Sequence, residues 1–311
     1  MIVALAGGVG GARLANGLAK LLAPEDLIIA VNVGDDFSHL GLSICPDIDT
    51  VTYTLAGLND EQRGWGIRNE TWSFMATLRQ LGGPDWFALG DRDLAKHVLR
   101  TERLRAGESL TAITRDIARA SGVAHVIIPV SDDPVRSIIQ TDEGDLSFQD
   151  YFVRRRCEPL FGGIRYDGAA AATANPQLLA ALANPALEAV VICPSNPILS
   201  IGPILAVPGV EESLRTARAP RIAVSPFIAG EAVKGPAAKI MRELGQSPGA
   251  GAIAEYYAGL VDVVVCDERD PAAGRVIGEV RMIAMDTLMQ GPAGQQRLAR
   301  ECLAAAASLR R

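Results

Sequence analysis

The amino-acid sequence predicts an α/β fold in which helices cover both faces of one mainly parallel sheet. Three observations carry this prediction. Residues 1–6 form a short apolar run, residues 7–11 are almost all glycine, and residues 12–22 place leucines at helical spacing. A second apolar run, residues 27–33, ends in a glycine and two aspartates. The second half of the chain then alternates short apolar runs with helical patterns, which is typical of a doubly wound, Rossmann-like sheet with right-handed crossovers.

Taken in order, the elements of this core follow from length and periodicity. Short apolar runs bounded by turn residues predict buried strands, and leucine or alanine at helical spacing predicts the crossover helices. An Asp-Glu-Gly turn between two β-like runs predicts a hairpin over residues 137–148. The expected core strands are residues 1–6, 27–33, 124–130, 189–194, 221–225, 261–266 and 280–285, and the expected core helices are residues 12–22, 177–182, 210–217, 236–244 and 295–309.

Residues 37–121 contain no comparable buried strand. Loops with glycine, tryptophan and arginine alternate there with four helical patterns, at residues 49–58, 71–81, 94–104 and 109–120. We therefore expect a core made of residues 1–36 and 122–311, with residues 37–121 as a helical insertion. Open α/β sheets bind ligands at the carboxyl ends of their strands, so we place the insertion over that edge.

Composition narrows the class of protein. The chain has 311 residues and a net charge of −6, so any anion site must be local, and no nucleic-acid surface is expected. Its five cysteines include no C-x-x-C pair, which favours reduced, buried thiols over disulfides or zinc. No apolar run approaches the roughly 18 residues that span a bilayer. We expect a soluble cytoplasmic protein without a membrane segment.

The opening glycines are the first candidate site. Glycine lets a backbone approach phosphate closely, and the N–H groups at a helix start favour an anion, so Gly8, Gly10 and Gly11 are candidate phosphate contacts. Arg13 adds a two-pronged donor for phosphate oxygens. The pattern is neither the dinucleotide fingerprint, because Arg13 replaces its third glycine, nor a P-loop, because no Gly-Lys-Ser/Thr follows. A plain strand-to-helix turn is the alternative.

Two acidic clusters are the second candidate site. Asp35 and Asp36 follow the second strand, where acidic residues often meet a ribose or a metal; a solvated turn is the alternative. Asp47 and Asp49 lie near a helix start, where they either cap backbone N–H groups or hold a hard divalent cation. Because the cluster lacks histidine and its neighbouring acids offer oxygen ligands, magnesium suits it better than zinc.

Further polar residues lie beside predicted strands and helices. Arg92 lies between two aspartates, and it either clamps an anion or forms a surface ion pair. Ser195 and Asn196 follow a buried strand, where they either donate to a ligand or simply end the strand. Lys234 precedes a helix and can reach an anion there, although an isolated lysine is usually solvated. His97 follows Arg92 on the same predicted helix. Its side chain could face the cleft under the insertion, but we favour a placement away from that cleft.

Together these segments resemble the 2-phospho-L-lactate transferase (CofD) family of coenzyme F-420 biosynthesis. A related branch of nucleotide-sugar-binding regulators shares the glycine start, but its turn is GGGTG-like and a serine-rich loop follows the second strand. The Gly-Gly-Val-Gly-Gly turn and the Asp35-Asp36-Phe37 loop favour the transferase branch. The matching segments run in order through most of the chain: GGVGGARLA (7–15), NVGDDF (32–37), GLSICPDIDTVTYTLAG (41–57), GW..RNET (64–71), WFALGDRDLAKHVLR (86–100), SNPILSIGPIL (195–205) and VKGPAAKIM (233–241).

The resemblance implies a magnesium-dependent transfer between two small molecules. One is the guanosine diphosphate ester of a phospho-acid, and the other is the deazaflavin alcohol Fo, whose ribityl hydroxyl attacks phosphorus and displaces GMP. Phospholactate, phosphoenolpyruvate and 3-phosphoglycerate all remain open as the acid. The insertion would form the deazaflavin side of the cleft, and we expect a homodimer, the commonest assembly. The resemblance assigns Asp49 and Arg92 as catalytic, Asp49 with Asp35 and Asp36 to the metal, and as substrate contacts Gly8, Gly10, Gly11, Arg13, Asp49, Arg92, Ser195, Asn196 and Lys234.

Overall fold

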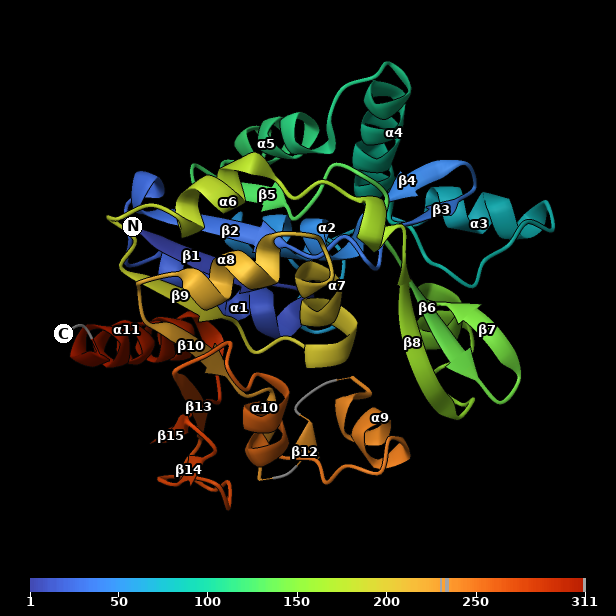
Figure 1. The fold of residues 1–311 in the computed structure, drawn as a ribbon. Coiled ribbons are helices and arrows are strands. Elements are labelled where there is room, and N and C mark those ends of the chain that lie inside the picture. The colour runs from blue at the N-terminus through green and yellow to red at the C-terminus, as the bar shows by residue number, and fades with distance from the viewer. Residues whose placement is uncertain (230, 233–234, 310–311) are drawn as a thin grey trace.

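One eight-stranded sheet runs through the middle of the molecule in the order β14-β15-β13-β10-β9-β1-β2-β5 (Figure 1). This computed structural model describes residues 1–229, 231–232 and 235–309. Every strand pair of the sheet is parallel except β14–β15, which confirms the predicted mainly parallel α/β fold. The strands are β1 (Ile2–Ala6), β2 (Leu27–Val31), β5 (Val126–Pro129), β9 (Ala189–Ile192), β10 (Arg221–Val224), β13 (Val263–Asp267), β14 (Val276–Ile277) and β15 (Val280–Met285).

Helices cover both faces because the central strands are apolar on both sides. All five residues of β1 are buried, and so are all four of β9. Helices α1 (Gly8–Ala19), α2 (Pro46–Leu55) and α11 (Gly291–Leu309) pack together on one face; α6 (Pro176–Leu182), α7 (Gly202–Leu205) and α8 (Val210–Thr216) pack together on the other. A side chain at Gly17 would lie 2.2 Å from the carbonyl oxygen of Gln295, so glycine there lets α1 and α11 approach closely.

The strand order changes direction beside β1. From β1 the chain builds outward through β2 to β5, and it then returns to place β9 on the other side of β1. A change of direction of this kind marks the edge at which open α/β sheets bind ligands, here the carboxyl ends of β1 and β9.

Residues 37–121 contain a short hairpin that periodicity did not predict. Strands β3 (Phe37–His39) and β4 (Leu42–Ile44) pair around Leu40 and Gly41, both of which have positive φ. Strands of three residues are too short for alternation to reveal, so the expected loops and helices of this segment did not include this hairpin. The helices of this segment are α2, α3 (Ser73–Gln80), α4 (Asp91–Arg105) and α5 (Leu110–Ala120); α2 packs on α1, α4 on β4 and α5 on β5.

A separate antiparallel sheet has the order β7-β6-β8. It contains the predicted hairpin, as β6 (Arg136–Thr141) and β7 (Gly144–Ser147), together with an unpredicted third strand, β8 (Phe161–Asp167). Sequence patterns missed β8 because a helical turn and a loop, residues 148–160, separate it from the hairpin that it joins. The remaining elements are η1 (Pro24–Asp26), η2 (Asp150–Arg154), η3 (Ala169–Ala171), η4 (Pro197–Ile201), β11 (Phe227–Ile228), β12 (Glu231–Ala232), α9 (Ala237–Glu243) and α10 (Ala250–Tyr256).

Two expectations from composition can be compared directly with the structure. All five cysteines are free, and four of them are buried, as the scattered spacing predicted. Among the described residues, none of the helices has both the length and the apolar character needed to cross a bilayer.

Candidate functional site

The glycines after β1 form the first turn of α1 rather than a loop before it. We expected the helix to start at residue 12, but it starts at Gly8. A side chain at Gly10 would lie 2.3 Å from the carbonyl oxygen of Pro194, and one at Gly11 would lie 2.4 Å from Ser195 Oγ. These two glycines therefore let α1 pack against the loop after β9. Gly8 has a φ of +63° and open space around its Cα, so it is the glycine with room for a ligand.

Ser195 and Asn196 lie directly beside this turn. The Ser195 hydroxyl accepts from the Gly7 N–H at 3.0 Å and donates to the Gly7 carbonyl at 2.8 Å. Asn196 Oδ1 accepts from the N–H groups of Ile198 and Leu199, both at 3.0 Å, and so caps η4. Within the described residues Asn196 Nδ2 is buried without a partner, which leaves one free donor in the loop after β9. Lys234, the other predicted nucleotide contact, lies outside the described residues.

Asp47 joins the start of α2 to the start of α1. The Gly8 N–H donates to Asp47 Oδ1 at 2.7 Å. Asn32 Nδ2 donates to Asp47 Oδ2 at 2.9 Å and also to Asp35 Oδ1 at 3.0 Å. The Gly34 N–H in turn holds Asn32 Oδ1 at 2.7 Å. One amide thus brings two carboxylates together at the carboxyl ends of β1 and β2, one strand away from the reversal between β1 and β9.

Burial governs the charge of this cluster. It raises the pKa of Asp35 well above its ordinary value, helped by the nearby Asp47 charge, and it raises the pKa of Asp47 to about 6. Asp36 has a pKa raised to about 7, also through burial, although Arg136 opposes the shift. Asp36 is 6% exposed and its Oδ1 has no partner among the described residues, so the solvated-turn alternative is wrong. A buried cluster of acids needs either protons or a cation to balance it.

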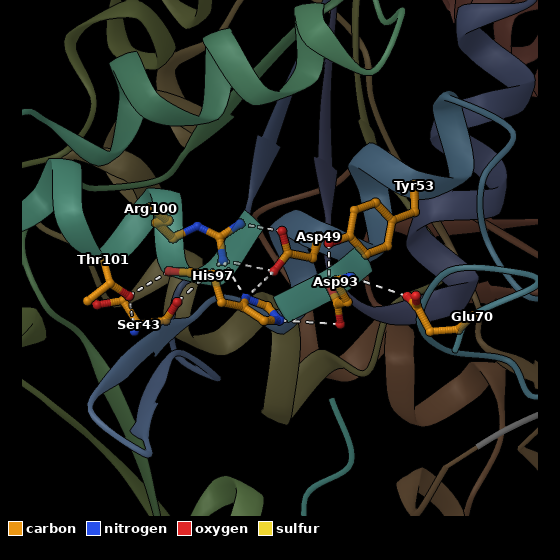
Figure 2. A network of polar contacts seen from close by, with 8 residues as sticks. All are labelled: Ser43, Asp49, Tyr53, Glu70, Asp93, His97, Arg100 and Thr101. Atoms are coloured by element: carbon orange, nitrogen blue, oxygen red, sulfur yellow. Dashed lines mark hydrogen bonds and ion pairs between the residues drawn. The ribbon is translucent and has the colours of Figure 1, made fainter. Parts of the chain in front are cut away.

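Asp49 lies on a different side of α2, in a second buried network (Figure 2). The Arg100 guanidinium grips its carboxylate with two prongs, from Nη1 to Oδ2 at 2.9 Å and from Nη2 to Oδ1. Arg100 Nη1 also lies 3.2 Å from His97 Nδ1, and His97 Nε2 lies 3.3 Å from Asp93 Oδ2. The Tyr53 hydroxyl donates to Asp93 Oδ1. The histidine is therefore buried in this network.

The start of α4 is capped from outside the helix. Glu70 accepts from the N–H groups of Arg92 at 2.7 Å and Asp93 at 3.2 Å. Asp91 instead caps the preceding helix, accepting from the N–H groups of Ser73 and Phe74 at 3.0 Å each. The Arg92 side chain is exposed and donates to the Arg68 carbonyl at 3.3 Å, with no ion pair among the described residues. Its cation is thus available to a ligand.

Arg13 lines a hollow on the flank of α1 that faces α2. On a helix, residues two positions apart point in nearly opposite directions, so Arg13 lies away from Gly11 and from the loop after β9. The described residues give Arg13 neither an ion pair nor a side-chain hydrogen bond. The hollow is lined by Val9, Arg13, Thr50, Tyr53, Thr54, Asn59, Asp60, Glu61, Gly64, Trp65 and Gly66.

Several site residues were absent from the predicted set. Asn32 and Asp47 belong to the acidic cluster with Asp35, and Asn32 was not predicted as a site residue. Asp47 had been considered only as one of a pair with Asp49. Tyr53, Asp93 and Arg100 surround Asp49. A signal existed in the sequence: Asp93, His97 and Arg100 recur at helical spacing on one face of a predicted helix, and polar residues that face a neighbouring helix need partners.

The fold and this geometry define an α/β protein in which a glycine-rich helix start meets buried acids beside the switch point of the sheet. The chain belongs to the family described as 2-phospho-L-lactate transferase CofD, whose model matches residues 2–287. It is accordingly an enzyme of the transferase class.

Relatives carry two different names. A phosphoenolpyruvate transferase from Kitasatospora aureofaciens is 40% identical over 319 residues, covering 99% of this chain and 98% of the relative. A 2-phospho-L-lactate transferase from Methanosarcina mazei is also 40% identical, over 271 residues, covering 87% and 88%. A crystal structure of a Bacillus halodurans protein covers 97% of this chain and 98% of its own, with a TM-score of 0.64 and 15% identity, which shows the shared fold alone.

Proposed function

We propose that this enzyme transfers a phospho-acid from its guanosine diphosphate ester to the deazaflavin alcohol Fo, in the biosynthesis of coenzyme F-420. The oxygen of the terminal ribityl hydroxyl attacks the phosphorus that bears the acid. The bond from that phosphorus to the bridging oxygen breaks, GMP leaves with that oxygen, and the hydroxyl proton is released. The product is a phosphodiester of the acid and Fo.

The observation that carries this proposal is the meeting of the α1 start with Asp47 and Asp35 at the switch point. The N–H groups of Val9 and Gly10 have no acceptor outside the helix within the described chain, so this helix start retains donors for phosphate oxygens. Asn196 Nδ2 lies in the neighbouring loop as a further unused donor. We assign the guanylyl diphosphate to this helix start, with the N–H groups of Val9 and Gly10 as donors and Gly8 as the glycine that leaves room for it.

The acidic cluster fits a magnesium ion. Asp35 and Asp47 present carboxylate oxygens held by one amide, and Asp36 Oδ1 is buried without a partner in the part of the chain that the structure describes. Oxygen ligands of this kind suit magnesium, which commonly also touches substrate phosphates. Once bound, the ion would neutralise charge on the diphosphate and on the attacked phosphorus. Asp35 and Asp47 would hold it together with substrate phosphate, because Asp36 does not bring a third ligand oxygen within 4.8 Å of both among the described residues.

Asp49 is also a candidate for the metal, in the one trio of potential ligands that gathers closely among the described residues. Asp49, Asp93 and His97 have ligand atoms within 4.8 Å of one another, as a metal site requires. The Arg100 guanidinium, however, already binds both Asp49 oxygens and would repel a divalent cation. We therefore propose that Asp49 accepts from the Fo hydroxyl as an anchored carboxylate, while the exposed Arg92 contacts Fo or the transferred phosphate.

The deciding experiment is incubation of the protein and magnesium with Fo and each guanylylated acid in turn: phospholactate, phosphoenolpyruvate and 3-phosphoglycerate. Mass spectrometry of the deazaflavin product identifies the preferred acid, and GMP release measures turnover. A deazaflavin phosphodiester with stoichiometric GMP supports the proposal. Binding of guanine nucleotide or nucleotide-sugar without GMP release from any ester refutes it and favours the regulatory alternative.

A further inference from the structure

A ring of buried polar side chains connects α2 to α4 (Figure 2). We call it the polar ring; its members are Asp49 and Tyr53 on α2 and Asp93, His97 and Arg100 on α4. On each helix the members recur at spacings of three or four residues, so they share the face turned toward the other helix. Arg100 is 1% exposed and Asp49 is 5% exposed. The polar ring is thus a charged contact built inside the protein.

The hydrogen bonds of the polar ring have a fixed direction. A guanidinium only donates, so His97 Nδ1, 3.2 Å from Arg100 Nη1, accepts. The proton of a neutral imidazole then lies on Nε2, which faces Asp93 Oδ2 at 3.3 Å. The Tyr53 hydroxyl donates to the other oxygen of Asp93. Arg100 Nη1 is therefore held from two sides, by His97 and by Asp49.

This arrangement immobilises the Asp49 carboxylate. A planar fork that binds both oxygens fixes the plane of the carboxylate as well as its position, which a single ammonium cannot do. The one remaining lone pair on each Asp49 oxygen then has a fixed direction. A hydrogen-bond acceptor that orients a reacting hydroxyl is effective only when it is held this closely.

We propose that Arg100 is a positioning residue for the acceptor alcohol and that it acts only through Asp49. This inference rests on the proposed function, because Asp49 is the residue assigned there to the Fo hydroxyl. If the inference is right, removing the fork is harmful only while Asp49 still has a carboxylate to be oriented.

A double-mutant cycle tests this dependence. The variants are Arg100→Met, Asp49→Asn and the double variant, with kcat/KM for Fo, KM for the guanylylated acid and the dissociation constant of Fo measured for each. We expect each single change to lower kcat/KM for Fo about 100-fold. We expect the double variant to be no worse than either single variant, because both changes remove one interaction. KM for the guanylylated acid should stay within about threefold of wild type.

Two further variants separate positioning from charge and from folding. Arg100→Lys keeps the charge but loses the fork, so it should remain impaired. Arg103→Met is the matched control, since Arg103 lies on the same helix and binds Glu108 and Asp116 instead of the polar ring; it should retain wild-type kcat/KM. Arg100→Met alone leaves the Asp49 charge buried without its partner and can fail to fold. In that case we compare Arg100→Lys with the double variant, which removes both buried charges together.

The outcomes are distinguishable. Three results would overturn the positioning role while leaving the proposed function intact. The single effects could multiply in the double variant, Arg100→Met could keep wild-type rates, or KM could rise equally for both substrates. If the wild-type protein binds Fo but transfers nothing, the proposed reaction is refuted. The dissociation constants of Fo for the same four proteins then decide whether Arg100 acts through Asp49. If wild type does not bind Fo at all, both fail.

Discussion

The Gly8 N–H donates to Asp47 Oδ1 at 2.7 Å, so the start of α1 already holds a carboxylate where a helix start would attract a phosphate. The two residues are 39 positions apart in the chain, and Asn32 connects the same carboxylate to Asp35. A diphosphate can approach this helix start only when the acidic charge is balanced. The predictions below follow from that relationship and from the surroundings of the individual site residues.

The first prediction concerns magnesium. Asp47→Asn keeps the shape of the side chain but removes one of the two charges held by Asn32. We expect magnesium affinity and the rate of GMP release at limiting magnesium to fall by at least about tenfold. Calorimetric titration with magnesium and a rate series over magnesium concentration measure both, with Asp26→Asn, an exposed acid, as the control. Unchanged magnesium dependence in Asp47→Asn would remove this residue from the metal site.

The second prediction concerns pH in metal-free buffer. Asp36 has a folded-state pKa of about 7, against roughly 4 in an unfolded chain, so the folded protein binds more protons between these values. The free energy of unfolding therefore falls as pH rises from about 4 to 7, by about 3 kcal/mol for this one group. Urea unfolding across this range should show that wild type loses stability relative to Asp36→Asn. If the free energies of unfolding of the two proteins changed in parallel with pH, Asp36 would not be a buried carboxyl with a raised pKa.

The third prediction separates two neighbouring glycines. A Cβ at position 10 would lie 2.3 Å from the Pro194 carbonyl oxygen, so Gly10→Ala must push α1 away from the loop after β9. We expect a loss of about 3 kcal/mol or more in urea unfolding. Gly8→Ala meets no atom and is strained only by its φ of +63°, which costs about 1–2 kcal/mol. If Gly8→Ala were the more damaging change to stability, the packing explanation would be wrong.

The fourth prediction assigns two arginines to different substrates. Arg13 lines one hollow with Val9, whose N–H we assign to the diphosphate, so we expect Arg13→Gln to raise KM for the guanylylated acid about tenfold. We expect Arg92→Gln to raise KM for Fo about tenfold, because it loses a charge-assisted hydrogen bond to that ligand. Neither side chain has an ion pair among the described residues, so the melting temperature should change little in both variants. Steady-state kinetics with one substrate varied at a time provides the test. An exchange of the two effects would reverse the assignment.

The residues of the acidic cluster show how far sequence patterns reach. Asp35 and Asp36 follow a strand and were identifiable as candidates, because the carboxyl ends of parallel strands meet at one edge. Asp47 could be named only as one of a pair, since its distance from Gly8 depends on how α2 packs on α1. Asn32 was invisible as a functional residue, because an asparagine at the end of an apolar strand is equally typical of a turn.

Asp49 shows the opposite limit. The family resemblance singled it out, but its partner Arg100 is 51 positions away, and sequence spacing alone does not reveal which two helices meet. Ser195 was named as a nucleotide contact, whereas the structure uses both functions of its hydroxyl on Gly7. Its role toward a ligand stays a prediction, as do the homodimer and the domain boundaries at residues 36 and 121.

By itself the sequence determined the parallel α/β sheet, the helix after the glycines and the acidic character of the loops at the carboxyl edge, because these follow from local periodicity, burial and backbone freedom. Only the tertiary structure decided which acid contacts the α1 start and which acid an arginine holds. Both depend on the packing of α2 between α1 and α4, and packing is a property of whole faces rather than of any one segment.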